Sequence, residues 1–166
     1  MDLKRTGSEV ELRGEAERLR GAGLLTAAEA EALDISAIAR FWQSPIGVAI
    51  REQQANVRRE FAFTAAFSPA EIARVTGSFF TGDANDFVVV QGAVDLAVLL
   101  PGEIWIVDFK TDRISETEIG ARSQEYKNQL WLYAVALERI YHRPVKRRTL
   151  HFLALGQSVE MPHQPI

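Results

Sequence analysis

The stretch VVVQGAVDLAVLLPGEIWIVDFKTD, residues 88–112, decides the fold because it holds two apolar runs joined at a turn. Both runs are rich in residues that favour strands, and Pro101-Gly102 marks the turn. If they pair as an antiparallel hairpin centred there, Asp95 lies opposite Asp108. Lys110 follows Asp108 by two residues and so shares its face. This register is an assumption, because L-proline does not suit the favoured two-residue hairpin turns and a three-residue loop would shift it.

Both faces of this hairpin are apolar. The face of Asp95 and Asp108 includes Ala93, Ala97, Ile104 and Ile106, and the opposite face includes Val94, Leu96, Val98, Trp105, Val107 and Phe109. A solvated sheet face explains one carboxylate, but a strand buried on both sides should not hold two unpaired aspartates. Opposed like charges also destabilise a sheet unless a positive charge lies between them. A divalent cation site is therefore the better interpretation.

Hard oxygen ligands suit Mg²⁺ or Mn²⁺, and we predict Asp95, Asp108 and the backbone carbonyl of Phe109 as ligands. A metal-bound water can attack a phosphorus, and Lys110 would orient that water or stabilise charge on the phosphate oxygens. This is the minimum equipment for metal-assisted phosphodiester hydrolysis, with Asp95, Asp108 and Lys110 as the catalytic set.

The rest of the chain predicts an α/β fold with a helical layer at the N-terminus. Residues 3–54 read as helices, with starts at Thr26, Asp34 and Ser44-Pro45. Strands are expected at 60–67, 75–81, 87–100, 104–109 and 150–155, with a turn at 82–86. A long helix is expected from Ser115 to about Tyr141, before Pro144.

Composition limits the class of protein. A length of 166 residues with 47% hydrophobic residues fits one domain with a real core. The net charge of -3 does not itself indicate a nucleic-acid binder. The absence of cysteine excludes disulfides, thiolate zinc sites and Cys-ligated iron-sulfur clusters, and is compatible with the cytoplasm. No run approaches the roughly 20 apolar residues of a membrane span, and no signal peptide is evident, so we expect no membrane partner.

Three segments resemble motifs of one nuclease family. Residues 92–95 (GAVD), 108–112 (DFKTD) and 129–133 (QLWLY) are similar to the GxxD, D-Y/F-K-T-D and QxxxY motifs of PD-(D/E)XK nucleases. The likeness is closest to the RecB-like branch, in particular the C-terminal nuclease domain of AddA-type helicase-nuclease subunits. Flanking segments at 24–26, 41–45 and 59–63 also match, so the resemblance covers nearly the whole chain.

The resemblance implies a restriction-endonuclease-like core, a mixed central sheet flanked by helices. Residues 1–57 would form the helical layer and 58–161 the core of a single nuclease domain within a larger helicase-nuclease. Its partners would be single-stranded or duplex-end DNA, the helicase domains and a second helicase-nuclease subunit, in double-strand-break processing and recombinational repair. The enzyme would be an exonuclease-type hydrolase.

Further residues are assigned by the same resemblance. Gln129 lies in an apolar stripe with Tyr126 and Tyr133, and the family implies that Gln129 and Tyr133 face the active site and bound DNA; plain packing is the equal alternative. Glu60 is a minor candidate that would support the metal through water, against the simpler interpretation of a solvated strand-end carboxylate.

One departure concerns histidine. The RecB-like branch takes a further metal ligand from a histidine near the start of the nuclease domain, whereas the first histidine here is His142. We therefore expect an excised fragment or a truncated relative that binds Mg²⁺ or Mn²⁺ weakly, cleaves DNA poorly and regains activity with an upstream helix. The alternatives are an impaired module for DNA binding or subunit docking, and a stand-alone small exonuclease.

The remaining polar clusters and large aromatic residues have ordinary structural interpretations. His142 and His151 are expected to be a helix-end and a strand residue, and Trp42 and Trp131 core residues. Five cations near the end of the long helix suit its dipole, with phosphate contact as the alternative; they are Arg139, Arg143, Lys146, Arg147 and Arg148.

Overall fold

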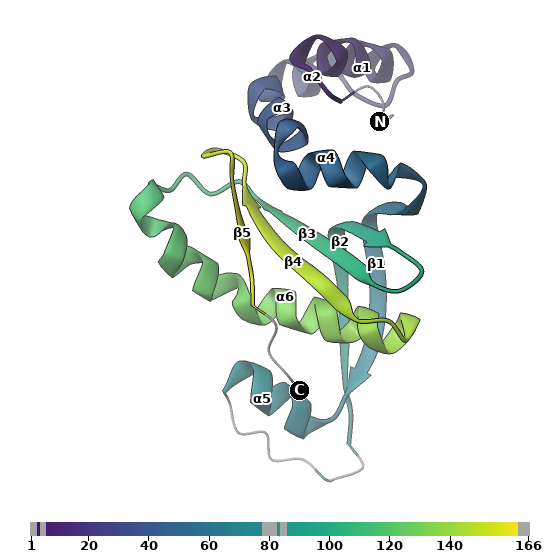
Figure 1. Ribbon diagram of the computed structural model, residues 1–166, viewed down its shortest axis with the longest axis vertical. Helices are drawn as coiled ribbons and strands as arrows, with labels where there is room; N and C mark the ends of the chain where they lie inside the picture. Colours follow the sequence, from purple (N-terminus) through teal and green to yellow (C-terminus); the bar gives the residue numbers. More distant parts are fainter. Residues whose placement is uncertain (1–2, 4–5, 78–82, 84–85, 163–166) are drawn as a thin grey trace.

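The computed structural model describes residues 3, 6–77, 83 and 86–162 (Figure 1). Its N-terminal part is helical: α1 (Glu9–Gly21), α2 (Ala27–Ala32), α3 (Ile35–Gln43) and α4 (Pro45–Glu52), followed by the short η2 (Gln54–Asn56). The three predicted helix starts are confirmed. Thr26 and Glu29 form a capping box, Asp34 caps α3, and Ser44 caps α4 with Pro45 in the first turn.

Within the described residues, five strands form one mixed sheet in the order β1-β2-β3-β4-β5. They are β1 (Val57–Phe67), β2 (Val88–Leu99), β3 (Ile104–Lys110), β4 (Val145–Phe152) and β5 (Gln157–Glu160). The pairs β1–β2, β2–β3 and β4–β5 are antiparallel, whereas β3 and β4 are parallel. A parallel pair needs a long crossover, and η3 (Glu116–Glu118) with α6 (Ile119–Tyr141) provides it.

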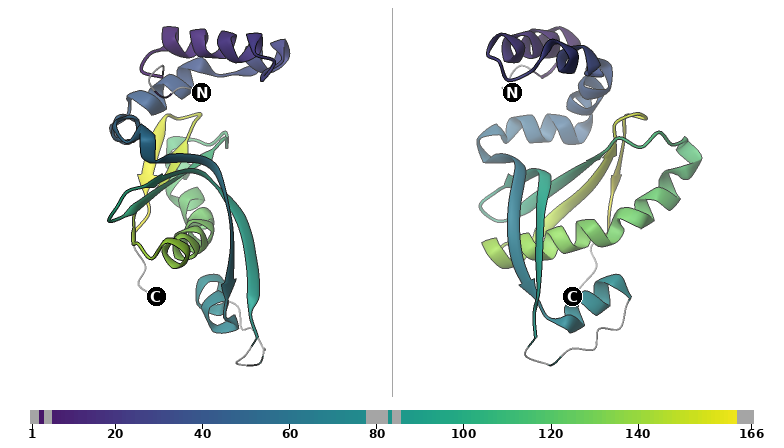
Figure 2. Two further views of the ribbon diagram at one scale, coloured as in Figure 1. Left: turned by 90° about the vertical axis from the view of Figure 1, so that its right-hand side faces the viewer. Right: turned by 180° about the vertical axis from the view of Figure 1, so that it is seen from behind.

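The sheet separates two apolar cores. On one face α6 packs its buried residues, among them Leu130, Trp131 and Leu137, against β1, β3 and β4 (Figure 2). On the other face, Phe41, Trp42 and Ile50 from α3 and α4 pack against the segments of β2 and β3 that pair with each other. The predicted helical layer therefore covers only that end of the sheet, and both tryptophans expected in the core are buried.

The long helix agrees with its prediction. Ser115 and Glu118 form the expected capping box, η3 opens the segment, and α6 runs without a break to Tyr141. His142 ends it in the left-handed conformation, with φ of 52°, and Pro144 follows. Gln129 and Tyr133 therefore lie one turn apart on a single helix. Among the described residues, no helix combines the length and apolarity that crossing a membrane requires.

Two parts of the predicted secondary structure are wrong. The strand expected at 75–81 is contradicted by α5 (Pro69–Thr76), which contains Val75; residues 78–81 lie outside the described residues, as does most of the expected turn at 82–86. Ser68 caps α5 in a capping box with Glu71, and this local signal outweighs the β-branched residues at its end. The last predicted strand instead begins at Val145 and ends at Phe152, and β5 was not predicted.

Candidate active site

The β2–β3 hairpin has the predicted register. Leu96 pairs with Val107 and Val98 pairs with Trp105, and the amide of Leu100 donates to the carbonyl of Glu103 across the turn. Leu96 and Val107 are the last pair of this ladder, and Asp95 and Asp108 are the next residues beyond that pair on the two adjacent strands. Oδ2 of Asp95 accepts a hydrogen bond from the backbone amide of Phe109 at 2.7 Å, which directs its carboxylate toward β3 beside Asp108.

The alternation of faces along β2 shifts at Asp95. Val94 packs into the core beneath α6, whereas Leu96, two residues on, packs into the core beneath α3 and α4. The expectation that Ala93 and Ala97 share one face is therefore wrong, because Ala93 is exposed and Ala97 is fully buried in the α6 core.

The neighbouring strand β1 shows the physical reason for the shift. Arg59 lies opposite Leu96 and Phe61 opposite Val94, which leaves Glu60 opposite Asp95. Glu60 has φ of 46°, in the left-handed region that a residue with a Cβ avoids. The side chains of β1 and β2 thus change faces of the sheet at Glu60 and Asp95. Local backbone strain of this kind is common at functional sites.

Asp108 is the centre of a buried polar network. Its side chain is 5% exposed, and Nζ of Lys110, on a side chain 12% exposed, lies 2.7 Å from its Oδ2. Lys110 also donates to Oε1 of Gln129 at 3.0 Å, and Nε2 of Gln129 donates to Oδ1 of Asp108 at 3.4 Å and to the Tyr133 hydroxyl at 2.7 Å. The end of β3 and the middle of α6, which are far apart in the sequence, meet in this network.

Burial raises the pKa of the Asp108 carboxyl above its ordinary value, more than the hydrogen bond and the charge of Lys110 lower it, and repulsion from Asp95 raises it further. Oδ2 of Asp108 is buried and, apart from the ion pair with Lys110, has no hydrogen-bond donor in the described part of the chain. A buried carboxylate that is costly to ionise and incompletely satisfied fits the binding of a further cation.

The glycine of the GxxD segment has a packing role. A Cβ on Gly92 would lie 2.9 Å from Cζ of Phe63 and 3.0 Å from Cε1 of Tyr133, closer than real Cβ contacts. Those two rings meet edge to face with centroids 5.3 Å apart. The absent side chain at Gly92 therefore allows Tyr133 to reach the sheet and place its hydroxyl beside Gln129.

A cavity of about 460 Å³ opens beside Asp95, between α3 and strands β1–β3. Glu60 and Asp95 line it together with Arg59, and its apolar wall includes Ile38 and Phe109. Glu60 thus shares a cavity with Asp95, but within the described ranges no three His, Cys, Asp or Glu side chains gather closely enough to form a metal cluster.

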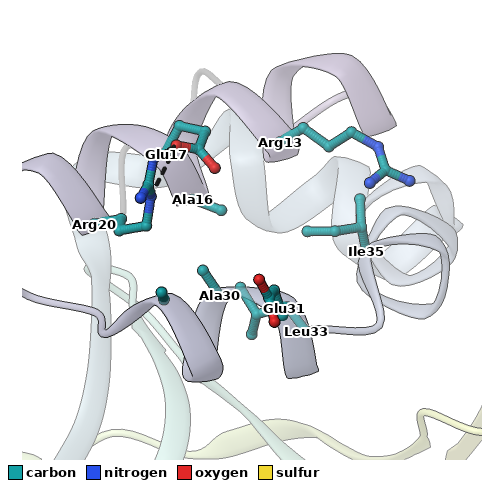
Figure 3. A pocket seen from close by; sticks show the side chains of 9 residues that line it. Arg13, Ala16, Glu17, Arg20, Ala30, Glu31, Leu33 and Ile35 are labelled. Atoms are coloured by element: carbon teal, nitrogen blue, oxygen red, sulfur yellow. Dashed lines mark hydrogen bonds and ion pairs between the residues drawn. The ribbon is translucent and has the colours of Figure 1, made fainter.

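A larger cavity, of about 680 Å³, lies elsewhere, between α1 and α2 (Figure 3). Ala16 and Ala30 line it from opposite helices, and Glu17 and Arg20 at its edge pair with each other. It contains none of the predicted site residues, so its size does not mark the chemistry.

Neither His142 nor His151, the histidines among the described residues, joins the carboxylates. His142 is the helix-end residue expected, and the strand residue His151 is fully buried between Phe41 and β5, where its Nδ1 lies 2.9 Å from Oγ of Ser158. Burial, with a smaller contribution from Arg40, lowers the pKa of His151 to about 4, so that its ring is neutral at neutral pH.

Most of the predicted cationic cluster has structural partners. Arg139 bonds to the Ala66 carbonyl and to Glu71, Arg143 donates to the Leu100 carbonyl, and Arg147 stacks on the ring of Trp105. Arg148 is buried. These contacts favour the structural interpretation over phosphate binding.

Two further residues belong to the network and were not assigned from the sequence. The ring of Tyr126 lies against Lys110, and the Tyr126 hydroxyl bonds to Asp112. The signal was available, because Tyr126 shares the helical stripe of Gln129 and Tyr133, and Asp112 is the last residue of the DFKTD segment.

Comparison with known proteins identifies the family of the chain. Residues 5–161 match the sequence model of the PD-(D/E)XK nuclease superfamily. Among curated proteins, the chain is 33% identical over 160 residues to the AddA subunit of the ATP-dependent helicase/nuclease of Carboxydothermus hydrogenoformans, covering 96% of this chain and 13% of that protein. The corresponding proteins of Alkaliphilus oremlandii and Moorella thermoacetica are each 31% identical, over 97% and 94% of this chain and 13% and 11% of their own lengths.

The chain thus spans about an eighth of the length of these relatives. The match of the three motifs, the mixed sheet with its flanking helices and the family comparison agree, and the chain belongs to the PD-(D/E)XK nuclease superfamily.

Proposed function

We propose that this chain is a metal-dependent nuclease domain that hydrolyses DNA phosphodiester bonds, in the processing of double-strand-break ends for recombinational repair. The observation that carries the proposal is the buried Asp108–Lys110–Gln129 network beside Asp95. Its location would be the cytoplasm. The names of its relatives favour helicase domains in the same polypeptide and a second subunit as partners. We also propose that the domain cleaves DNA as an exonuclease.

The donor set fits a hard divalent cation. Asp95 and Asp108 supply carboxylate oxygens from adjacent strands, and the backbone carbonyl of Phe109 is the third oxygen ligand in the proposal. Glu60, on β1, supports the metal site from the side of Asp95 that faces away from β3. When bound, Mg²⁺ or Mn²⁺ supplies an activated water and stabilises charge on the phosphate.

The chain's own residues then orient the reactants. Lys110 carries the positive charge that stabilises a phosphate oxygen or orients the attacking water, and Gln129 fixes its ammonium group by accepting a hydrogen bond from it. The Tyr133 hydroxyl accepts from Gln129, so its own proton is left to donate to a phosphate oxygen of DNA. The middle of α6 thereby acts as the support for the charged group on β3.

A second candidate is a nuclease fold that binds DNA or docks a partner without turnover. It is favoured by one observation, that the described residues assemble no third acidic or histidine side chain with Asp95 and Asp108. For both candidate functions, we propose that the chain forms a single domain, with residues 1–57 as the helical layer and residues 58–161 as the core.

The test is cleavage of end-labelled single-stranded DNA in the presence of Mn²⁺. We expect slow, metal-dependent cleavage that is abolished in Asp108→Ala and unchanged in Glu160→Gln, which removes an exposed carboxylate on β5. DNA binding without cleavage by the wild type would favour the second candidate, and cleavage that persists in Asp108→Ala would refute the proposed site.

A further inference from the structure

We propose that Tyr126 and Asp112 are positioning residues that hold the Lys110 ammonium group in place, Tyr126 through its ring face and Asp112 through the Tyr126 hydroxyl. The proposal rests on the proposed function, in which Lys110 is the charged catalytic residue.

Three protein groups surround the Lys110 ammonium group. Its Nζ lies 2.7 Å from Oδ2 of Asp108, donates to Oε1 of Gln129 at 3.0 Å and lies 3.7 Å from the centroid of the Tyr126 ring. A cation within about 6 Å of an aromatic centroid is attracted by the electron density of the ring face. The ring therefore closes the third side of the ammonium group.

The ring itself is fixed at its far end. The Tyr126 hydroxyl bonds to both carboxylate oxygens of Asp112, at 3.0 Å and 3.1 Å, and Nε of Arg122 lies 3.6 Å from the same carboxylate. Burial and the bond to Asp112 raise the pKa of the Tyr126 hydroxyl, so that it remains a donor. Tyr126 thus spans from α6 to the loop after β3, and Asp112 prevents the ring from rotating away.

Positioning of this kind matters because lysine is flexible. Its four-carbon chain loses considerable rotamer freedom when its head is fixed, and it has no preorganised geometry of its own. Asp108 cannot supply the constraint alone, since the same carboxylate is the proposed ligand of the cation. Tyr126 and Gln129, one turn apart on α6, hold Lys110 by groups that are not proposed metal ligands.

The ordinary alternative is that Tyr126 only packs on the core beneath α6, to which it contributes a partly buried ring. That role predicts a loss of stability on truncation but no specific effect on Lys110. The matched control is Tyr141 on the same helix, whose partly buried ring packs against Phe61 with centroids 6.0 Å apart. Tyr141→Leu removes an equal ring without touching the network.

The kinetic test measures single-turnover cleavage of single-stranded DNA with Mn²⁺, with the enzyme in excess over the DNA and at a saturating concentration. We expect Tyr126→Leu to lower the maximal rate constant by about ten- to a hundredfold, because roughly 1 Å of misplacement costs on the order of a hundredfold. The enzyme concentration that gives half of the maximal rate should change little. Tyr126→Phe, which keeps the ring and loses the anchor, and Asp112→Asn should each fall between Tyr126→Leu and the wild type. Tyr141→Leu should cleave as the wild type does.

The second test reads the contact directly and needs no activity. The chain has four lysines, Lys4, Lys110, Lys127 and Lys146, so labelling of lysine ε-carbons gives few NMR signals, and Lys110→Arg identifies the one of interest. An ε-methylene over a ring face is shifted upfield by the ring current. We expect that shift in the wild type and Tyr126→Phe and its loss in Tyr126→Leu, with the Lys146 signal unchanged as evidence of an intact fold.

An unshifted Lys110 signal in the wild type, or a shift that survives Tyr126→Leu, would overturn the proposal. So would cleavage by Tyr126→Leu at the wild-type rate. A wild-type chain with no Asp108-dependent cleavage would refute the proposed function instead, and the NMR comparison would still decide whether Tyr126 holds Lys110.

Discussion

Substituting alanine for Gly92 should damage the site without touching any of its polar atoms. The added Cβ would lie 2.9 Å from Cζ of Phe63 and 3.0 Å from Cε1 of Tyr133, against 3.4 Å for an ordinary close contact. The two rings must therefore retreat by roughly half an ångström, and Phe63 has little freedom because it is 6% exposed. Most of the movement is left to Tyr133.

The size of the effect follows from this geometry. Overpacking of a close-packed core typically costs about 1–3 kcal/mol, which for a chain of this length lowers Tm by roughly 2–12 °C. Tyr133 bonds to Gln129 at 2.7 Å, and Gln129 in turn bonds to Lys110 at 3.0 Å. A half-ångström displacement passed to Lys110 should slow cleavage about tenfold, since roughly 1 Å costs on the order of a hundredfold.

The assays are urea unfolding followed by circular dichroism and single-turnover cleavage with Mn²⁺. The control is Gly14→Ala in the middle of α1, where the added Cβ meets no atom within 4 Å. It should raise the free energy of unfolding by up to about 1 kcal/mol, because alanine is the better helix former. Gly92→Ala with the stability and rate of the wild type would refute the packing argument.

Substitutions at three other residues have defined outcomes. Asp108→Asn should raise the Tm of the metal-free protein, because burial disfavours the charged form of Asp108 and raises its pKa. A lower Tm would show that the ion pair with Lys110 outweighs the cost of burial. Glu60→Gly should raise the free energy of unfolding in urea by about 1 kcal/mol, because glycine adopts the left-handed backbone conformation of this position without strain. Glu60→Gln should not raise it, and equal values for the two variants would argue against backbone strain. His151 has a pKa of about 4 in the folded chain, against an ordinary value of 6.5, so the unfolded chain binds more protons between these two pH values. The free energy of unfolding should therefore fall by up to about 3 kcal/mol as the pH drops from 7 to 4. His151→Leu should flatten this dependence, and an unchanged slope would assign the acid sensitivity to other groups.

The hairpin and the helices could be predicted from the sequence because their signals are local. Capping boxes at Thr26 and Ser115 and the turn at Pro101-Gly102 each fix an element within a few residues. The register across that turn then followed from counting, and it placed Asp95 opposite Asp108. The α5 helix was not predicted, although Ser68 and Glu71 carry the same capping pattern, and the strand expected at 75–81 overlaps its end.

The rest depends on long-range geometry. Simple alternation along β2 cannot reveal that the faces change at Asp95, because the cause lies in the backbone of Glu60 on another strand. The contact of Tyr126 with Lys110 depends on how α6 crosses the sheet, which no local pattern specifies. The packing reason for Gly92 likewise emerges only when α6 brings Tyr133 against β2.

Binding of Mn²⁺ to the wild-type chain, measured by isothermal titration calorimetry beside Asp95→Asn, Asp108→Asn and Glu160→Gln, tests the central claim most directly. We expect one weak site in the wild type and in Glu160→Gln, because two carboxylates and one carbonyl leave most of an octahedral shell to water. Binding should be lost in Asp95→Asn and in Asp108→Asn. Mn²⁺ binding of equal affinity in Asp108→Asn and the wild type would contradict the proposal that the opposed aspartates of the β2–β3 hairpin hold the catalytic cation.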